Sequence, residues 1–419
     1  MSAFDKVIGY EEIKGELMQI VDMMRNGEVY EKLGAKMPNG VLLSGDPGLG
    51  KTLVAKCFIE ESGLKTFTIR KTKGDGDFVE MITDVFEKAK ENAPCIVFLD
   101  DLDKFANEDD RHRDAEEYVA VQAGIDAVKG TGVFILATVN DAEKLPESLK
   151  RCGRFDRIIE FSRPSAEDAA KIIEYYLSDK KVDSTLNMED LTKMIHYSSC
   201  AELETILNEA AVHAAYERKD SIQMEDLVTT VLKLQYRQPE NYNKASDEEL
   251  RMSALHEAGH LVVSEMLMSG SVGFAAVLPD GNGFVHPCER ARRREDHILI
   301  SLAGKTAVEL YYSETVASGC QSDLASALAD IRGGLTSNAT RGFGMVAIPS
   351  RGNSENLTSQ IDTVTRAMME EYSVRVKNIL LKNRGLLEAV ADALFEKRTL
   401  LFSDIREIKE KFEIVKVAV

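Results

Sequence analysis

A glycine-rich loop near the N-terminus constrains the fold of this chain most strongly. The loop, residues 45–52, follows the apolar run Gly40–Ser44 and leads directly into a segment with helical character. A strand, a glycine-rich loop and a helix in this order are typical of a P-loop, whose backbone amides surround the phosphates of a nucleotide. A random glycine-rich turn is the alternative, and the pair Lys51-Thr52 between both flanking elements argues against it.

The loop also supplies the predicted cofactor-binding residues. Lys51 is expected to reach the β- and γ-phosphates of the nucleotide, and Thr52 is expected to bind Mg²⁺. The predicted nucleotide-binding residues are Gly45, Asp46, Pro47, Gly48, Leu49, Gly50, Lys51, Thr52, Leu53 and Asp100. The chain is therefore predicted to use ATP with Mg²⁺.

Strands and helices alternate after the loop, which predicts an α/β domain with a parallel sheet. The fully apolar run Cys95–Leu99 is expected to be a strand buried on both faces, and it ends at Asp100 and Asp101. Carboxylates at the carboxyl end of a strand beside a P-loop are typical of a Walker B magnesium site. A second buried strand, 133–138, ends near Asn140, whose amide could orient the attacking water; a plain turn residue is the alternative.

A basic segment and a helical region follow this sheet. Arg151 and Arg154 lie close to the predicted phosphate site and suggest arginine fingers that act on a neighbouring subunit. A solvated basic loop explains their spacing equally well. Residues 164–237 are predicted to form a small helical lid, and the polar stretch 238–244 to form a linker.

The run His256-Glu257-Ala258-Gly259-His260 matches the zinc-protease pattern H-E-x-x-H. Ser246 and Glu249 form a capping box that predicts a helix start upstream of it. Histidines four apart share one face of a helix and can bind one ion, while Glu257 is the candidate base that takes a proton from the attacking water. Two ordinary helix histidines are the alternative.

A catalytic zinc site needs a third protein ligand. Asp323 is slightly preferred, because it follows the predicted turn 318–322 at the start of a helix expected over 324–335; simple helix-start electrostatics is the alternative. The candidates downstream of the motif are His286, Asp296, His297, Glu309, Glu314 and Asp323.

The charge and the cysteines limit the class of protein. The net charge of −18 argues against nucleic acid as the main partner. Six cysteines without paired spacing are typical of reduced thiols rather than a disulfide framework. The N-terminus lacks a signal-peptide core, and the chain has no run of about 18 apolar residues, which predicts a soluble, cytoplasmic protein without a membrane span.

Taken in order, these motifs resemble the FtsH family of AAA+ zinc metalloproteases. The segments FDKVIGYEEIKGEL, APCIVFLDDLD, RCGRFDR, LNEAAVHAA, HEAGH, AGKTAVEL and SGCQSDLASA are each similar to family segments in register. The resemblance implies an AAA+ domain (1–163), a helical lid (164–237) and a mainly helical zinc metallopeptidase domain (238–419).

The resemblance also implies roles for single residues. Asp323 corresponds to the family's third zinc ligand, beside His256 and His260, and Asn140 to the asparagine that senses the γ-phosphate. Arg151 and Arg154 correspond to arginines that reach the nucleotide of the next subunit. A finger acting in trans needs a head-to-tail ring. The family forms hexamers, so the resemblance implies a homohexamer that degrades protein substrates. The predicted strand 272–278 could offer its edge to the substrate.

Three departures from the family pattern stand out. Family members usually carry N-terminal membrane spans, and this chain starts at the AAA+ segment. Asp101 stands where the family has glutamate. The aromatic–hydrophobic–glycine triplet that grips substrate is missing after 77–81, although Phe78 and Val79 could serve instead. The alternatives are therefore a weak unfoldase that cuts loosely folded chains, or a nucleotide-switched scaffold with a structural zinc site.

Overall fold

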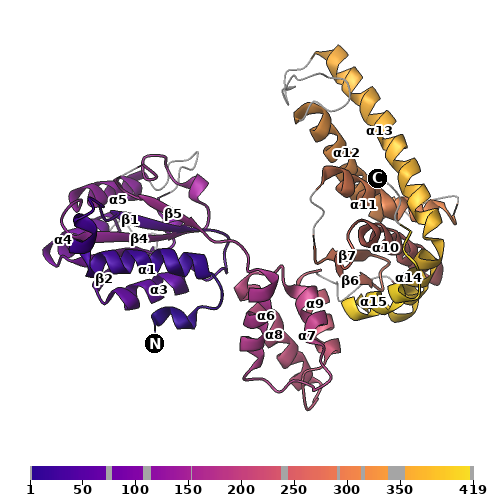
Figure 1. Cartoon of the computed structure of the whole chain (residues 1–419), viewed down its shortest axis with the longest axis horizontal. Helices are drawn as coiled ribbons and strands as arrows, with labels where there is room; N and C mark the ends of the chain where they lie inside the picture. Colours follow the sequence, from indigo (N-terminus) through magenta and orange to yellow (C-terminus); the bar gives the residue numbers. More distant parts are fainter. Residues whose placement is uncertain are drawn as a thin grey trace. The chain divides into compact units, whose positions relative to one another are not determined.

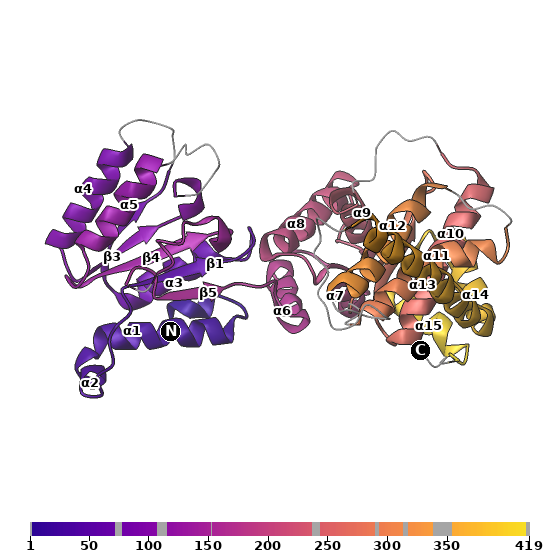
Figure 2. The ribbon, with the colours of Figure 1, turned by 90° about the horizontal axis from the view of Figure 1, so that it is seen from above.

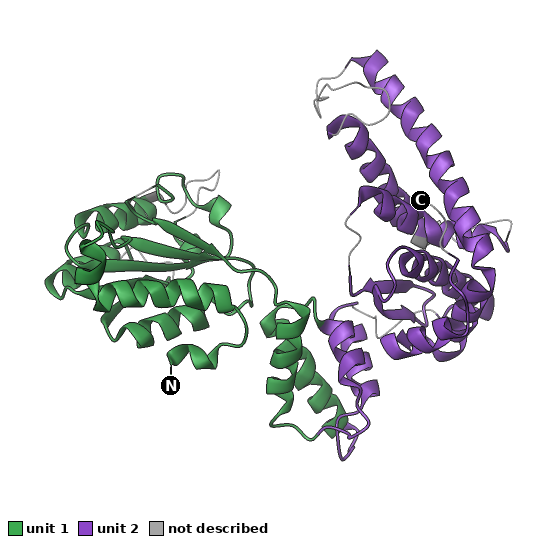
Figure 3. Ribbon diagram, in the orientation of Figure 1, with its two compact units in different colours: residues 1–181, 196–215 green, residues 182–195, 216–419 purple. Residues whose placement is uncertain are grey.

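The computed structural model describes residues 2–71, 78–106, 115–151, 153–236, 244–289, 293–312, 317–337 and 354–415. The chain forms two compact units, which Figure 3 shows in different colours. The first comprises residues 1–181 and 196–215, and the second comprises residues 182–195 and 216–419. The segment predicted as a separate lid contributes to both units, and the division into three domains remains a prediction.

A five-stranded parallel sheet forms the centre of the first unit. Its strand order is β2-β3-β4-β1-β5, so β1 and β4 lie side by side in the interior of the sheet. The strands are β1 (Gly40–Ser44), β2 (Lys65–Ile69), β3 (Cys95–Leu99), β4 (Val133–Val139) and β5 (Arg157–Glu160). Parallel pairing places the carboxyl ends of β1, β3 and β4 at one edge, where the P-loop begins and the acidic residues follow β3.

Helices cover both faces of this sheet (Figures 1 and 2). Phe134 and Leu136 of β4 face the core under α1 and α3, while Ile135 and Ala137 face the core under α4 and α5. This alternation explains why the central strands are apolar at every position. The helices are η1 (Ala3–Lys6), α1 (Glu11–Arg25), α2 (Gly27–Glu31), α3 (Lys51–Ser62), α4 (Phe78–Glu91), η2 (Leu102–Lys104), α5 (Ala115–Ala127) and η3 (Ala142–Lys144).

Phe78, the first residue of α4, is part of the core of the first unit. Its side chain is 7% exposed and packs edge-on against Phe105, with ring centroids 5.4 Å apart. The expectation that Phe78 could grip substrate is therefore wrong, because burial leaves its ring unavailable at the surface. Of the segment KTKGDG (71–76) before it, Lys71 is described and the remaining residues lie outside the described part of the chain.

Four helices follow the sheet, as the sequence predicted. They are α6 (Ala166–Leu177), α7 (Met188–Ile195), α8 (Cys200–Tyr216) and α9 (Met224–Leu234). Within the first unit, the backbone at the start of α8 contacts the P-loop, because the amide of Ala201 donates to the carbonyl of Gly48 at 3.1 Å. Of the predicted linker 238–244, Lys244 is described and the residues before it lie outside the described part of the chain.

The second unit combines helices with a three-stranded antiparallel sheet of order β7-β6-β8. Its strands are β6 (Val272–Val277), β7 (Gly283–Pro287) and β8 (Thr399–Leu401). β6 pairs with β7 on one side and with β8 on the other. The expectation of a free edge on this strand is therefore wrong, because a strand from the C-terminal region occupies the second side.

Besides α7 and α9, the second unit contains the helices from α10 onward, which pack around one apolar core. They are α10 (Asp247–Leu267), α11 (Arg294–Glu309), α12 (Ala317–Ser337), α13 (Glu355–Lys382), α14 (Arg384–Lys397) and α15 (Phe402–Glu410). The predicted turn over 318–322 is wrong, because α12 already begins at Ala317 and Asp323 lies past its first turn. The parallel sheet with helices on both faces, followed by a mainly helical part, confirms the predicted fold class.

Within the described residues, no helix is both long enough and apolar enough to cross a lipid bilayer.

Candidate active site

Helix α10 holds the H-E-x-x-H motif in the middle of the second unit. The hydroxyl of Ser246 accepts from the amide of Glu249, and the Glu249 carboxylate accepts from the amide of Ser246 at 2.7 Å. This capping box starts the helix where the sequence predicted it. Residues 254–266 are buried, because α11, α14 and β6 pack around this part of the helix. The motif is therefore held by a rigid, closely packed element.

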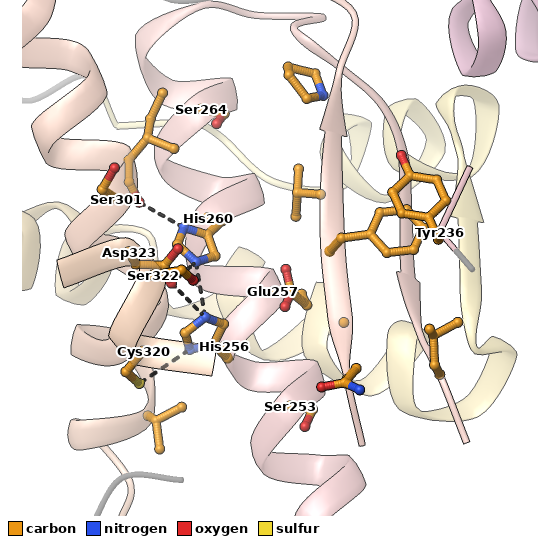
Figure 4. Close-up of a pocket in the computed structure, with 18 of the residues that line it drawn as sticks. Tyr236, Ser253, His256, Glu257, His260, Ser264, Ser301, Cys320, Ser322 and Asp323 are labelled. Atoms are coloured by element: carbon orange, nitrogen blue, oxygen red, sulfur yellow. Dashed lines mark hydrogen bonds and ion pairs between the residues drawn. The ribbon is translucent and has the colours of Figure 1, made fainter. Parts of the chain in front are cut away.

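Three predicted ligands converge beside this helix (Figure 4). The Nε2 atoms of His256 and His260 lie 3.0 Å apart. The Oδ2 atom of Asp323, from α12, lies 3.1 Å from the first nitrogen and 3.2 Å from the second. The three ligand atoms are all within 4.8 Å of one another. Two imidazoles and one carboxylate form a donor set typical of catalytic zinc, which keeps a further position open for water or substrate.

Burial and charge shift the pKa values in this cluster. Burial raises the pKa of Glu257, and the two nearby histidines only partly oppose that effect. Burial alone would raise the pKa of Asp323, but hydrogen bonds to both imidazoles lower it below its usual value. Burial alone would lower the pKa of His260, yet Asp323 and Glu257 raise it overall. The cluster thus stabilises positive charge at the point where the three ligand atoms meet, which fits a bound cation.

Two glycines allow neighbouring elements to approach this cluster. A Cβ atom on Gly304 of α11 would lie 2.5 Å from the Nε2 atoms of both histidines. A Cβ atom on Gly283 of β7 would lie 2.6 Å from the Cγ atom of Glu257. Only glycine leaves room for the side chains of the motif at these two positions.

The cluster lines a pocket of about 930 Å³ within the second unit. Glu257 lies between the histidines and the strands β6 and β7 (Figure 4). Apolar side chains such as Met252, Leu278 and Val308 line the same pocket. The arrangement therefore places a buried carboxylate and three potential metal ligands on one cavity that can accept a peptide segment.

The other candidates for the third ligand lie elsewhere. Nδ1 of His286 pairs with the hydroxyl of Tyr236 at 2.7 Å, and Glu309 pairs with Lys305. Asp296 is buried near Arg293, and His297 lines the pocket without joining the cluster of three. Glu314 lies outside the described residues.

In the first unit, the P-loop residues meet the residues that follow β3 and β4. Lys51 is 6% exposed, and its Nζ atom donates to the carbonyls of Gly45 and Asp46 and to Oδ1 of Asn140, at 2.6, 2.8 and 3.0 Å. Burial lowers the pKa of Lys51, while the carboxylates of Asp103 and Asp101 act in the opposite direction. The structure thus places Lys51 and Asn140 together, at the carboxyl edge of the sheet.

The Walker B carboxylate Asp100 faces the P-loop threonine. Its Oδ1 atom accepts from the hydroxyls of Thr52 at 3.0 Å and of Thr138 at 2.9 Å. Thr138 also accepts from the amide of Asp101 at 2.9 Å, so one hydroxyl connects both acidic residues to β4. Oxygen ligands from Thr52 and Asp100 on adjacent elements suit a hydrated Mg²⁺ ion.

Asp101 has a positive φ of 57°, and its Oδ2 atom lies 2.6 Å from Nζ of Lys104.

If Asp101 orients the attacking water, Asp101→Glu will raise steady-state ATP turnover roughly two- to tenfold, a small part of the total effect of a general base. The extra methylene lets the carboxylate reach further from the backbone. Thermal unfolding of both proteins controls for strain at the left-handed residue. A lower turnover in a stably folded variant would show that the site is adapted to aspartate and Lys104.

The two predicted arginine fingers differ in their surroundings. Arg154 donates from Nε and Nη2 to the carboxylate of Asp126 in α5, at 3.0 and 2.7 Å. This paired interaction raises the pKa of Arg154. Arg151 is exposed. Their action on a neighbouring subunit remains a proposal.

Three further residues that no predicted site includes are brought into these sites by the geometry. Thr138 bonds the carboxylate of Asp100 and the main-chain amide of Asp101, and a polar residue near the end of a buried strand was a usable signal for it. Gly304 and Cys320 approach the imidazoles from α11 and α12. Their roles depend on how three helices pack, and the sequence carries no local signal for that.

Two family models match the chain, in the order in which the two sites occur. The model described as "ATPase family associated with various cellular activities (AAA)" matches residues 41–163. The model described as "Peptidase family M41" matches residues 243–408. The first match covers the P-loop and the Walker B residues, and the second covers all three potential zinc ligands.

Curated relatives match almost the whole chain. The ATP-dependent zinc metalloprotease FtsH 3 of Symbiobacterium thermophilum is 31% identical, over 97% of this chain and 71% of that protein. The ATP-dependent zinc metalloprotease FtsH of Thermus thermophilus is 31% identical, over 97% of this chain and 70% of that protein. The protein of the same name from Mycoplasma pneumoniae is 30% identical, over 97% of this chain and 62% of that protein.

Proposed function

Because this chain belongs to the FtsH family of ATP-dependent zinc metalloproteases, we propose that ATP hydrolysis in its first unit drives protein substrates to the zinc site of its second unit. Membership makes the protein an ATP-dependent zinc metalloendopeptidase, with Zn²⁺ and ATP–Mg²⁺ as its cofactors. The observation that carries the proposal is the convergence of His256, His260 and Asp323 beside Glu257 on one pocket.

At the zinc site, His256, His260 and Asp323 would hold the ion. Zinc, when bound, supplies a Lewis acid that polarises the scissile carbonyl and makes water more acidic. Glu257 takes the proton from the attacking water and passes it to the leaving amine. Its position between the two histidines and the strands β6 and β7 holds the carboxylate beside the point where the three ligand atoms meet.

The free edge of β7 is the proposed binding site for the substrate backbone. Among the described strands, β7 pairs with β6 alone, and its residues Gly283 and Val285 line the pocket beside Glu257. An extended substrate could therefore add as a further strand next to the reacting groups. Main-chain hydrogen bonds would provide binding without a strict sequence requirement, which suits an enzyme that degrades many segments of a chain.

The nucleotide site supports a ring assembly. Lys51, Thr52, Asp100 and Asn140 act on the nucleotide of their own chain, and we assign Arg151 and Arg154 to the nucleotide of a neighbouring chain. A head-to-tail interface that repeats around a closed ring brings this about, and the proposed assembly is a homohexamer. The exposure of Arg151 agrees with an action outside its own chain.

A weak unfoldase is the second candidate. Phe78 is buried in the core of the first unit, so the substitute for a gripping aromatic suggested by the sequence is not available. In this case nucleotide binding would mainly assemble the ring, and the peptidase would cut loosely folded chains. Both candidates use the same zinc chemistry and differ only in the force applied to the substrate.

One experiment tests the proposal and separates the two candidates. The purified protein is incubated with a stably folded tagged protein and with an unfolded chain such as casein, each with and without ATP. We expect ATP-dependent loss of both substrates, and a chelator should stop cleavage until zinc is restored. Loss of the unfolded chain alone would support the weak unfoldase. Cleavage of neither substrate by the zinc-loaded protein would refute both and favour a structural zinc site.

A further inference from the structure

The thiol of Cys320 lies against the ring of His256. Its Sγ atom is 3.9 Å from Nδ1 of His256, and the side chain is 6% exposed. Cys320 precedes Asp323 by three positions on α12, so the two side chains share one face of the helix. Helix α12 therefore presents both a potential metal ligand and a thiol to α10.

In both histidines, Nδ1 is the ring nitrogen that can bond to a group outside the three ligands. Both Nε2 atoms face Oδ2 of Asp323, so each Nδ1 atom lies on the far side of its ring. A neutral imidazole that binds a metal through Nε2 carries its proton on Nδ1. This N–H group normally donates to an acceptor that holds the ring in place.

The acceptors for the two rings differ in strength. For His260 the partner of Nδ1 is the main-chain carbonyl of Ile300 in α11, at 2.7 Å. For His256 the atom that faces Nδ1 is the sulfur of Cys320. A carbonyl oxygen is a good acceptor and a thiol sulfur is a weak one. The Nδ1 atom of His260 therefore faces a stronger hydrogen-bond acceptor than the Nδ1 atom of His256 does.

We propose that Cys320 is the positioning residue of His256: its sulfur accepts the Nδ1–H bond and keeps Nε2 directed at the zinc. This inference rests on the proposed role of His256 as a zinc ligand. The thiol lies beside the outer nitrogen, and it does not join the three ligand atoms that lie within 4.8 Å of one another, so it is not assigned as a fourth ligand. The zinc affinity of the site thus depends on a thiol outside the ligand set.

Three substitutions separate hydrogen bonding from packing. Cys320→Ala removes both the acceptor and some volume, Cys320→Val fills the space without an acceptor, and Cys320→Ser restores an acceptor in a smaller side chain. Cys288→Ala is the matched control, because Cys288 is also a buried thiol of the second unit, and its Sγ donates to the carbonyl of Gly270 at 3.0 Å. All four variants and the parent chain are first compared by thermal unfolding.

Zinc affinity, measured by competition with a chromophoric chelator, is the main readout. We expect an affinity about tenfold lower in Cys320→Ala and Cys320→Val, the lower end of the effect of losing such a partner. Cys320→Ser should stay within about threefold of the parent, and Cys288→Ala should match it. Parental affinity in folded Cys320→Val or Cys320→Ala would overturn the proposal, because zinc binding would then not depend on the sulfur as an acceptor.

The spectrum of the Co²⁺-substituted protein gives an independent readout. We expect visible bands without a thiolate-to-cobalt charge-transfer band in the parent, and shifted visible bands in Cys320→Ala. A thiolate charge-transfer band that disappears in Cys320→Ala would make Cys320 a ligand and overturn its positioning role. His260→Ala tests the zinc site separately. If His260→Ala still binds zinc as the parent does, the proposed ligand set is wrong. If His260→Ala loses zinc while Cys320→Ala keeps the parental affinity, only the positioning role of Cys320 is overturned.

Discussion

Replacing Glu257 by glutamine will abolish peptide-bond cleavage while leaving zinc binding and ATP hydrolysis in place. Glutamine keeps the size of the side chain in its buried position, 6% exposed, but it cannot accept the proton of the attacking water. We expect the cleavage rate of an unfolded substrate to fall by about 10²–10⁴-fold, the contribution of a general base. The measurements are the initial rate with casein, the zinc content per chain and the steady-state ATPase rate.

The matched control for this variant is Glu249→Gln on the same helix. Glu249 is exposed at the start of α10, and glutamine can still complete the capping box with Ser246. The control should therefore cleave at the parental rate. If Glu257→Gln retains cleavage within about threefold of the parent, a factor far smaller than a general base contributes, another group must act as the base.

Replacing Lys51 by alanine will remove ATP-dependent degradation of a folded substrate and will spare the cleavage of short unstructured peptides. Lys51 is a buried cation at the P-loop, bonded to two loop carbonyls and to Asn140. Its loss removes the positive charge that stabilises the transferring phosphoryl group, so ATP turnover should fall by about 10²-fold or more. Parallel assays of ATP turnover, of loss of a folded tagged protein and of peptide cleavage measure the effect.

Lys56→Ala is the matched control for Lys51→Ala. Lys56 lies on the same helix α3, but its side chain is exposed and points away from the core. This variant should keep the parental ATP turnover. Undiminished degradation of folded protein by Lys51→Ala, together with lost ATP turnover, would show that nucleotide hydrolysis does not drive the substrate to the zinc site.

Elements with strong local signals were predicted closely. The strands Gly40–Ser44 and Cys95–Leu99 were predicted with the bounds that the structure shows. A parallel strand that is buried on both faces has an uninterrupted apolar sequence, which makes its ends visible. The start of α10 was predicted for a similar reason, because a capping box is complete within four consecutive residues.

The errors arose where a distant segment decided the outcome. β6 has no free edge, because β8 from the C-terminal region pairs with it. Phe78 is buried, because it packs against Phe105 in the core of the first unit. Asp323 lies inside α12 rather than after a turn, because the glycine at 319 did not end the helix. For β6 and Phe78 the missing information was a tertiary contact rather than a local preference.

The sequence by itself determined the chemical parts of both sites. The spacing of His256 and His260 and the order of strand, P-loop and helix are local properties, set by the geometry of one helix and one loop. The resemblance to the FtsH family already indicated Asp323 as the third ligand, and the tertiary structure brought its carboxylate to both imidazoles. Only the tertiary structure brought Cys320 and the Ile300 carbonyl to the imidazoles. These contacts depend on the packing of α10, α11 and α12, because distances between separate helices follow from the whole core and not from any one segment.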